Sequence, residues 1–132
     1  MNAGAKKANR DYLWFLHADT SLKTENFSEL ENLIRNNKKI DKTLSYFDLA
    51  YTESGLTKFN AFFANIRSSI FGLPYGDQGL FVSKKTFQKI GNFPEDACFG
   101  EDMLFVRIAK SKGVKLNRIS SKLFTCARKY KK

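Results

Sequence analysis

Apolar and polar residues follow one another along the chain in blocks that fit short strands and helices. Residues 11–17, DYLWFLH, are almost wholly apolar and aromatic, which predicts a strand with both faces covered. Residues 43–51, TLSYFDLAY, predict a second strand. Between them, apolar residues recur at helical spacing from 26 to 37, so we expect a helix to connect the two strands.

A longer helix is predicted over residues 57–71, where apolar residues again recur at helical spacing. Gly72 and Pro74 follow it in the order typical of a helix C-terminus. Its apolar residues fall mainly on one face, in the positions of a helix that packs onto a core. They are Phe59, Phe62, Phe63, Ile66 and Ile70.

The remaining segments continue this alternation, without repeats or linker-like stretches. Alternating strands and helices indicate an α/β architecture, in which helices flank a mixed sheet. We therefore interpret residues 1–132 as a single domain. The other expected elements are helical turns within 1–10, a turn over 19–26, a short strand ending near 83, a helix over 84–91, a helix over 101–112, and two strands within 114–119 and 122–128.

The composition is that of a globular protein. Of the 132 residues, 42% are hydrophobic and 14% aromatic, unlike the apolar-poor profile of disordered chains. No apolar run approaches the roughly 18 residues that cross a membrane. Cys98 and Cys126 fit no metal-ligand spacing, and reduced thiols are their expected state. We therefore expect a soluble, cytoplasmic protein, with peripheral contact at the inner face of the membrane as an alternative.

The charge balance is strongly basic, with 23 Lys and Arg against 13 Asp and Glu and a net charge of +10. Such an excess attracts nucleic acid, anionic lipid surfaces and nucleotide phosphates without choosing among them, and it also fits a solubilising surface. Nucleic acid is the least favoured partner, because the aromatic residues occupy core-like positions and are not interleaved with Lys and Arg.

The chain's only histidine and an aspartate stand directly after the first predicted strand, in FLHADT. Ligands of open α/β sheets bind at the carboxyl ends of strands, and His17 and Asp19 would share one face if the strand continued. A carboxylate beside phosphates suits a hard cation such as Mg²⁺ or Mn²⁺. A plain turn, with Asp19 capping the next segment, explains the same residues, and their spacing does not decide between the two.

Two more acidic clusters stand at the ends of apolar segments. In YGDQG, glycines bracket Asp77 and Gln78 and would let the backbone approach a ligand, although a plain turn explains them too. In FGEDM, Glu101 and Asp102 fall in the first turn of a predicted helix, where the helix dipole favours negative charge. Acidic residues are common there for stability alone, but a carboxylate in this place can also take a proton from a hydroxyl.

In this order the segments resemble glycosyltransferase family 2, the inverting GT-A type that uses nucleotide-sugar donors. In that family an Asn-x-Gly segment opens a helix and is followed by an apolar strand ending in a DxD-type motif. Asn2 and Gly4 match the first piece, and YLWFLHADT matches the second, with His17 at the first Asp position. A bacterial subgroup is similar in FLHADT, GDQ, a GxFPE-like loop, ED and a T-x-A-R-[RK] ending, so the resemblance spans most of the chain.

The resemblance implies a role for each cluster. Asp19 would bind the divalent cation, Mg²⁺ or Mn²⁺, that bridges the donor's diphosphate, with His17 near the nucleotide or the metal. Asp102 would be the general base that deprotonates the acceptor hydroxyl, and Glu101 would support it or help to bind the acceptor. The residues that would line the sugar or acceptor pocket are Gly76, Asp77 and Gln78. Those that would help to hold the donor are Asn2, Gly4, Asp19, Arg128 and Lys129.

The same resemblance implies an incomplete domain. Relatives begin with a V-I-I-P-x-x-N-E-like strand and a further strand–helix pair that bind the nucleotide's base and ribose, and no such segment precedes Asn2. We therefore expect a partial GT-A fold without these N-terminal units, which binds its donor weakly and has impaired activity by itself. The donor sugar and the acceptor, whether glycan, lipid or small molecule, stay open. A noncatalytic interaction fragment and a small basic nucleic-acid-binding protein are the alternatives.

Overall fold

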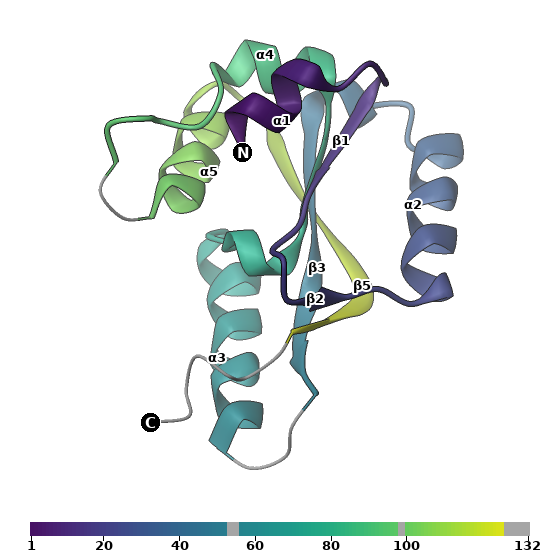
Figure 1. Ribbon diagram of the computed structural model, residues 1–132, viewed down its shortest axis with the longest axis vertical. Coiled ribbons are helices and arrows are strands. Elements are labelled where there is room, and N and C mark those ends of the chain that lie inside the picture. The colour runs from purple at the N-terminus through teal and green to yellow at the C-terminus, as the bar shows by residue number, and fades with distance from the viewer. Residues whose placement is uncertain (53–55, 98–99, 126–132) are drawn as a thin grey trace.

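The computed structural model describes residues 1–52, 56–97 and 100–125, which form a mixed five-stranded sheet with helices on both faces (Figure 1). The predicted α/β architecture with a mixed sheet is therefore confirmed. In chain order the elements are α1 (Asn2–Lys7), β1 (Tyr12–Phe15), β2 (Thr20–Ser21), α2 (Thr24–Asn36), the 3₁₀ turn η1 (Ile40–Lys42), β3 (Thr43–Tyr51), α3 (Leu56–Phe71), the 3₁₀ turn η2 (Gly76–Gln78), β4 (Leu80–Ser83), α4 (Lys84–Ile90), α5 (Glu101–Ser111) and β5 (Lys115–Thr125).

The sheet has the strand order β1-β4-β3-β5-β2, with β3 at its centre. Strand β3 is parallel to β5 along its whole length and antiparallel to β4 at Leu44 and Ser45. Strand β1 pairs with β4 only, and β2 with β5 only, both antiparallel. The long parallel pair of β3 and β5 therefore forms the main part of the sheet, and β4 joins β1 to this pair.

Apolar side chains fill both faces of the sheet, as the apolar runs predict. Figure 1 shows α2 on one side, with α1, α4 and α5 on the other. Phe47 and Leu123 lie in the cluster under α2, whereas Leu44 and Phe105 lie in the cluster on the opposite side. Each of these four is 0% exposed, and burying such a side chain contributes roughly 1.5–3 kcal/mol.

Several predicted boundaries agree with the structure, and two do not. The strand over residues 43–51 and the helix that ends at Phe71 are confirmed. The two strands expected after residue 113 are wrong, because β5 is one continuous strand. The register between β3 and β5 shifts between Phe47 and Asp48 of β3, and this shift accommodates the irregularity in the middle of β5. The segment after Asp19 is also more than a turn, since Thr20 and Ser21 pair with β5.

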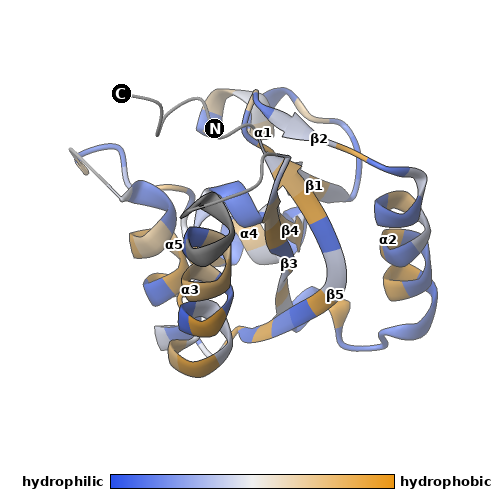
Figure 2. Ribbon diagram, turned by 90° about the horizontal axis from the view of Figure 1, so that it is seen from below, coloured by the Kyte–Doolittle hydropathy of each residue, from blue (hydrophilic) through white to orange (hydrophobic). Residues whose placement is uncertain are grey.

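Helix α3 packs onto the sheet with the face opposite to the one predicted. Its buried residues are the small Ala61, Ala64 and Ser68. Phe62 and Phe63, expected to face a core, are 59% and 63% exposed. In Figure 2, α3 carries orange, apolar segments although it lies on the outside of the molecule. Phe59, predicted for the same apolar face, belongs to a stretch whose side chains lie outside the described residues.

Hydrogen bonds from two side chains hold α3 and η2 to the sheet where β4 no longer covers β3. The Asn65 amide accepts from the Leu49 N–H at 2.8 Å and donates to the Leu49 carbonyl at 2.9 Å. The Gln78 amide donates to the Phe47 carbonyl at 3.2 Å. Buried backbone groups need such partners, so these amides replace the missing strand and fix how α3 lies on the sheet.

Among the described residues, no helix is both long enough and apolar enough to cross a membrane.

Candidate functional site

The turn η2 lies between the C-terminal end of α3 and the start of β4, and close packing holds its backbone in place. Gly79 has a φ of 63°, and a Cβ there would collide with the Leu123 side chain, so glycine is required. Gln78, which is 0% exposed, also donates to the Ser68 hydroxyl at 2.9 Å and accepts from the Tyr75 N–H at 3.2 Å. With its polar atoms bonded inside the protein, Gln78 shapes this turn and does not face a pocket.

Gly76 is the point at which three separate sequence motifs meet. Its N–H donates to Asp102 Oδ2 at 2.5 Å. A Cβ at this position would lie 2.8 Å from Asp102 Oδ2 and 2.8 Å from His17 Nε2. The residues that follow β1, form η2 and begin α5 therefore share one small space, which only a residue without a side chain leaves open.

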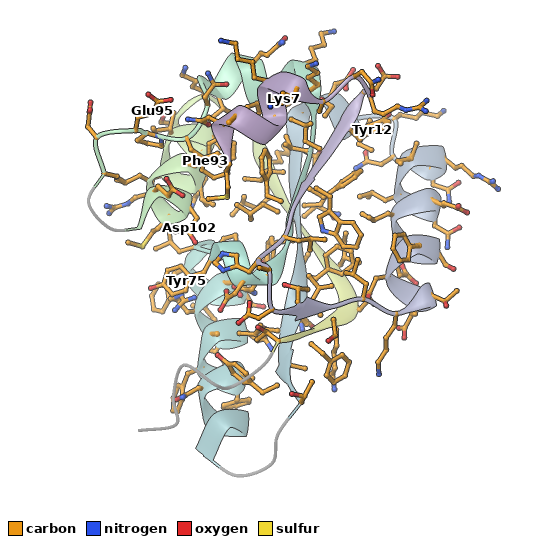
Figure 3. The ribbon with its side chains drawn as sticks, viewed as in Figure 1. Lys7, Tyr12, Tyr75, Phe93, Glu95 and Asp102 are labelled. Carbon is orange, nitrogen blue, oxygen red and sulfur yellow. The ribbon has the colours of Figure 1, made fainter. Side chains whose placement is uncertain are left out.

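The Asp102 carboxylate is held from two sides. While Oδ2 accepts from Gly76, Oδ1 accepts from the Met103 N–H at 2.9 Å. Asp102 also lies in the first turn of α5, where the helix dipole stabilises a negative charge. Figure 3 shows Asp102 beside Tyr75, in the region between α3 and α5. The group is half-buried, so it is both oriented by the backbone and reachable by a ligand. Its neighbour Glu101 is half-buried as well, with no side-chain hydrogen bond to another described residue.

The carboxyl group of Asp77 lies in η2, next to Gly76. Burial raises the pKa of the Asp77 carboxyl above its ordinary value of 3.8. The positive ends of His17 and Arg67 oppose this rise in pKa, and the negative charge of Asp102 adds to it. Three side chains from three other segments thus act on the pKa of the Asp77 carboxyl, a feature that clusters at functional sites.

Arg67 brings a cation to the same place. Its guanidinium lies 3.3 Å from the centre of the Tyr75 ring, and its Nε donates to the Leu73 carbonyl at 3.3 Å. Arg67 Nη2 and Asp77 Oδ1 are both buried and have no hydrogen-bond partner among the described residues. Since such groups are costly to leave unpaired, this donor and this acceptor indicate a missing polar partner.

A cavity of about 410 Å³ opens beside these two atoms. It runs from the end of β3 along α3 to η2, and it is lined by Leu49, Tyr51, Asn60, Phe63, Ala64, Arg67, Tyr75 and Asp77. Because one unpaired atom donates and the other accepts, a hydroxyl group, which does both, suits the pair.

The strand predicted over residues 11–17 is shorter than expected, and of the two alternatives for His17 and Asp19 the structure has the turn. Strand β1 ends at Phe15, and the Thr20 N–H donates to the His17 carbonyl at 3.1 Å, which closes a turn. His17 Nε2 lies beside Gly76, while Asp19 is half-buried without a side-chain hydrogen bond to another described residue. Across the described ranges, no three His, Cys, Asp or Glu side chains come together as a metal-ligand set.

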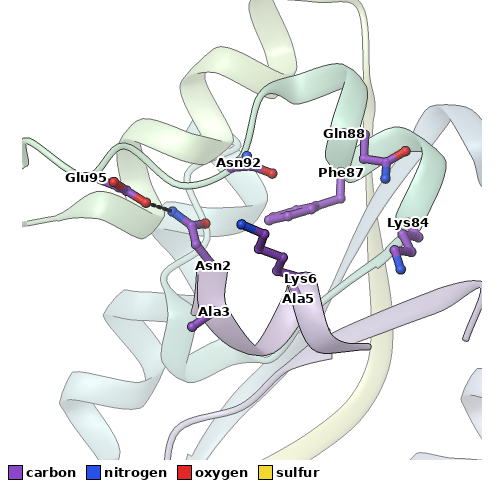
Figure 4. A pocket seen from close by; sticks show the side chains of 9 residues that line it. All are labelled: Asn2, Ala3, Ala5, Lys6, Lys84, Phe87, Gln88, Asn92 and Glu95. Atoms are coloured by element: carbon purple, nitrogen blue, oxygen red, sulfur yellow. Dashed lines mark hydrogen bonds between the residues drawn. The ribbon is translucent and has the colours of Figure 1, made fainter. Parts of the chain in front are cut away.

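Asn2 and Gly4 lie on α1, away from η2. The Asn2 amide exchanges two hydrogen bonds with the Phe93 backbone, both at 2.9 Å, and donates to Glu95 at 3.3 Å. Figure 4 shows Asn2 at the rim of a larger cavity, of about 610 Å³, between α1 and α4. Asn2 therefore secures the loop after α4. Arg128 and Lys129, also predicted to hold the donor, lie outside the described residues.

Arg67 and Tyr75 are site residues that the sequence does not single out. Arg67 falls within an apolar helix and belongs to no recognisable motif, and Tyr75 is an ordinary residue before a glycine turn. The one available signal is a cation inside the apolar helix α3, nine residues before the GDQ segment. Folding of the chain is what brings Arg67 over the Tyr75 ring and near Asp77.

Comparison with known proteins adds no family: no protein-family model matches the chain, and no curated protein matches it either.

Proposed function

We propose that the chain carries the catalytic centre of an inverting glycosyltransferase that moves a sugar from a nucleotide diphosphate to an acceptor hydroxyl. The observation that carries the proposal is the meeting of His17, Gly76 and Asp102, contributed by three distant segments. The residues on either side of Gly76, Tyr75 and Asp77, line a cavity that contains unpaired polar atoms. An oriented carboxylate, a nearby basic nitrogen and a cavity that suits a hydroxyl are the parts that such a reaction needs.

Asp102 acts as the general base. Two backbone N–H groups fix its carboxylate, and it takes the proton from the acceptor hydroxyl as that oxygen attacks the anomeric carbon. The new bond joins the acceptor oxygen to the sugar. The bond from the anomeric carbon to the diphosphate breaks on the opposite face, and the nucleoside diphosphate leaves with the electron pair. His17 Nε2 lies beside the same glycine, Gly76, to which the carboxylate is bonded.

Arg67 and Asp77 bind a second hydroxyl of the sugar or the acceptor, one that keeps its proton during the reaction. Arg67 Nη2 donates to its oxygen, and Asp77 Oδ1 accepts its proton in a hydrogen bond, which satisfies both unpaired atoms. A site that hydrogen-bonds a hydroxyl rejects analogues that lack it, because its own polar groups then stay buried and unpaired. This pair therefore supports selection for a sugar or alcohol ligand.

A divalent cation fits this site only when a bound ligand supplies some of the atoms that coordinate it. Asp19 is half-buried and uses no protein hydrogen bond, and Mg²⁺ commonly binds through one carboxylate together with substrate phosphates and water. Asp19 would hold the cation, whereas His17 would belong to the cluster around Asp102 and would not bind the cation. When bound, the cation would offset the charge on the leaving diphosphate.

Release of nucleoside diphosphate from a panel of UDP- and GDP-sugars, with water as acceptor, tests the proposal. We expect slow release that requires Mn²⁺ or Mg²⁺, falls on chelation, and weakens in Asp19→Asn. If no donor is hydrolysed with either cation, a noncatalytic interaction role replaces this proposal.

A further inference from the structure

The outward side of α3 carries several large apolar side chains that are exposed to solvent. Phe62, Phe63, Ile70 and Phe71 are 59%, 63%, 70% and 64% exposed, and they are the most exposed large apolar side chains of the described residues. The rings of Phe62 and Phe63 are 5.9 Å apart and packed edge to face. Monomeric proteins seldom leave such residues together on the surface without a use for them. We call these four residues the α3 face.

The exposure is built into the packing of α3 and cannot be removed by a small rotation of the helix. Ala61, Ala64 and Ser68 allow close approach to the sheet, which larger side chains would prevent. Asn65 pairs with both backbone groups of Leu49. Turning the α3 face inward would break these bonds and bring phenylalanine rings into a space fitted to alanines.

The charge around the α3 face favours an anionic surface. Over residues 60–71, α3 contains Arg67 but no Asp or Glu. Beyond the helix end, Lys110 Nζ lies 3.3 Å from the carbonyl oxygen of Phe71. A second copy of the chain would bring another net charge of +10 to the face, whereas anionic lipid headgroups would complement it. Phenylalanine and isoleucine on one face, with basic residues and no acidic ones, are typical of helices that lie in a bilayer surface.

We propose that the α3 face inserts into the surface of an anionic lipid bilayer, with the α3 axis lying along it. Insertion would bury the phenylalanine rings at the headgroup boundary while the sheet stays in water. The cavity beside η2 would then open at the membrane, because Phe63 lines it together with Arg67 and Asp77. Resting on the proposed function, it follows that the acceptor is an amphiphile whose hydroxyl-bearing head enters this cavity.

Vesicle co-sedimentation tests the lipid contact without reference to catalysis. The purified chain is mixed with vesicles of phosphatidylcholine alone or of phosphatidylcholine with phosphatidylglycerol, at low and high salt. The test variant combines Phe62→Ser and Ile70→Ser, because neither residue lines the cavity. The matched control is Ile34→Ser, since Ile34 is an apolar residue, 37% exposed, on α2 across the sheet.

We expect binding to the anionic vesicles, weaker binding to phosphatidylcholine alone, and weakening by salt. The double variant should bind at least about tenfold less tightly, with an unchanged far-ultraviolet circular dichroism spectrum, while Ile34→Ser binds like the parent chain. Equal binding of the double variant, or no binding to anionic vesicles, would overturn the proposal. So would concentration-dependent dimerisation, or binding of single-stranded nucleic acid, that the double variant abolishes, because the α3 face would then have another occupant.

This result is separable from the proposed function. Vesicle binding by a chain that hydrolyses no donor would support the lipid contact and reject the transferase. Donor hydrolysis without vesicle binding would support the transferase and reject the lipid contact.

Discussion

Replacing Gly76 with alanine should damage the cluster that joins the loop after β1, η2 and α5. The added Cβ would lie 2.8 Å from Asp102 Oδ2 and 2.8 Å from His17 Nε2, closer than a methyl group can approach either atom. Gly76 is not among the glycines with a left-handed φ, so the effect is one of space and not of backbone strain. Either the carboxylate or the imidazole must move.

We expect Gly76→Ala to lower the free energy of unfolding by roughly 1–3 kcal/mol, the usual range for inserting a methyl group where there is no room. If the cluster is catalytic, release of nucleoside diphosphate should fall by about a hundredfold, since a displacement of about 1 Å can cost that much. Urea unfolding measures the first quantity and a coupled nucleotide assay the second. Gly4→Ala is the stability control, because nothing lies within 4 Å of a Cβ there and Gly4 is in the helix α1.

The control should leave stability unchanged or raise it by about 0.5–1 kcal/mol, as alanine does inside a helix. A double-mutant cycle identifies the cause of the loss. In a His17→Ala background the alanine at 76 has one neighbour fewer, so its cost should shrink by about 0.5 kcal/mol or more. The three motifs do not meet at Gly76 if Gly76→Ala is as stable as the parent chain, or if it lowers the free energy of unfolding equally in both backgrounds.

Three further changes test the surroundings of the cluster. Because burial raises the pKa of Asp77 above 3.8, the folded chain holds this proton to higher pH than the unfolded one, and stability falls as pH rises through that interval. Asp77→Asn should remove this fall and raise the midpoint of urea unfolding at neutral pH, and a lower midpoint would contradict it. Asn65→Ala should cost roughly 1–3 kcal/mol and speed amide exchange at Leu49, whose backbone partners it removes. Gln78→Leu should cost a similar roughly 1–3 kcal/mol by leaving the Phe47 carbonyl unpaired, whereas an unchanged unfolding curve would refute its role in the turn.

Local patterns predict the elements of this chain better than the way they pack. The strand over residues 43–51 has the apolar content of a strand covered on both faces, and it forms as expected. The division of β5 was mispredicted because the polar residues in its middle resemble a turn. In the fold, pairing with β3 continues on both sides of the register shift, and those cross-strand bonds outweigh the local signal.

The orientation of α3 shows why periodicity can mislead. Spacing identifies an apolar face but not the surface that it meets. The space beside β3 accepts only small side chains, and the free backbone groups of Leu49 need an amide, so the face with Asn65 turns inward. The outward aromatics also remove one argument against nucleic acid, which rested on their core-like positions.

The candidate site could be predicted as separate motifs but not as an assembly. FLHADT, GDQ and ED each have a plain structural explanation, and only the folded chain brings His17 Nε2 and Asp102 Oδ2 to the same glycine. Arg67 and Tyr75 could not be found at all, because their contact depends on how the chain turns between α3 and η2.

The most direct test of the proposed function compares nucleoside diphosphate release by the parent chain, Asp102→Asn and Asp96→Asn with the best donor and Mn²⁺. Asp96 is an exposed acidic residue of the loop before α5, which makes its substitution a matched loss of charge. We predict that Asp102→Asn lowers the rate at least about a hundredfold, the usual contribution of a general base, while Asp96→Asn matches the parent chain. Equal rates for Asp102→Asn and the parent chain would contradict the assignment of Asp102 as the base.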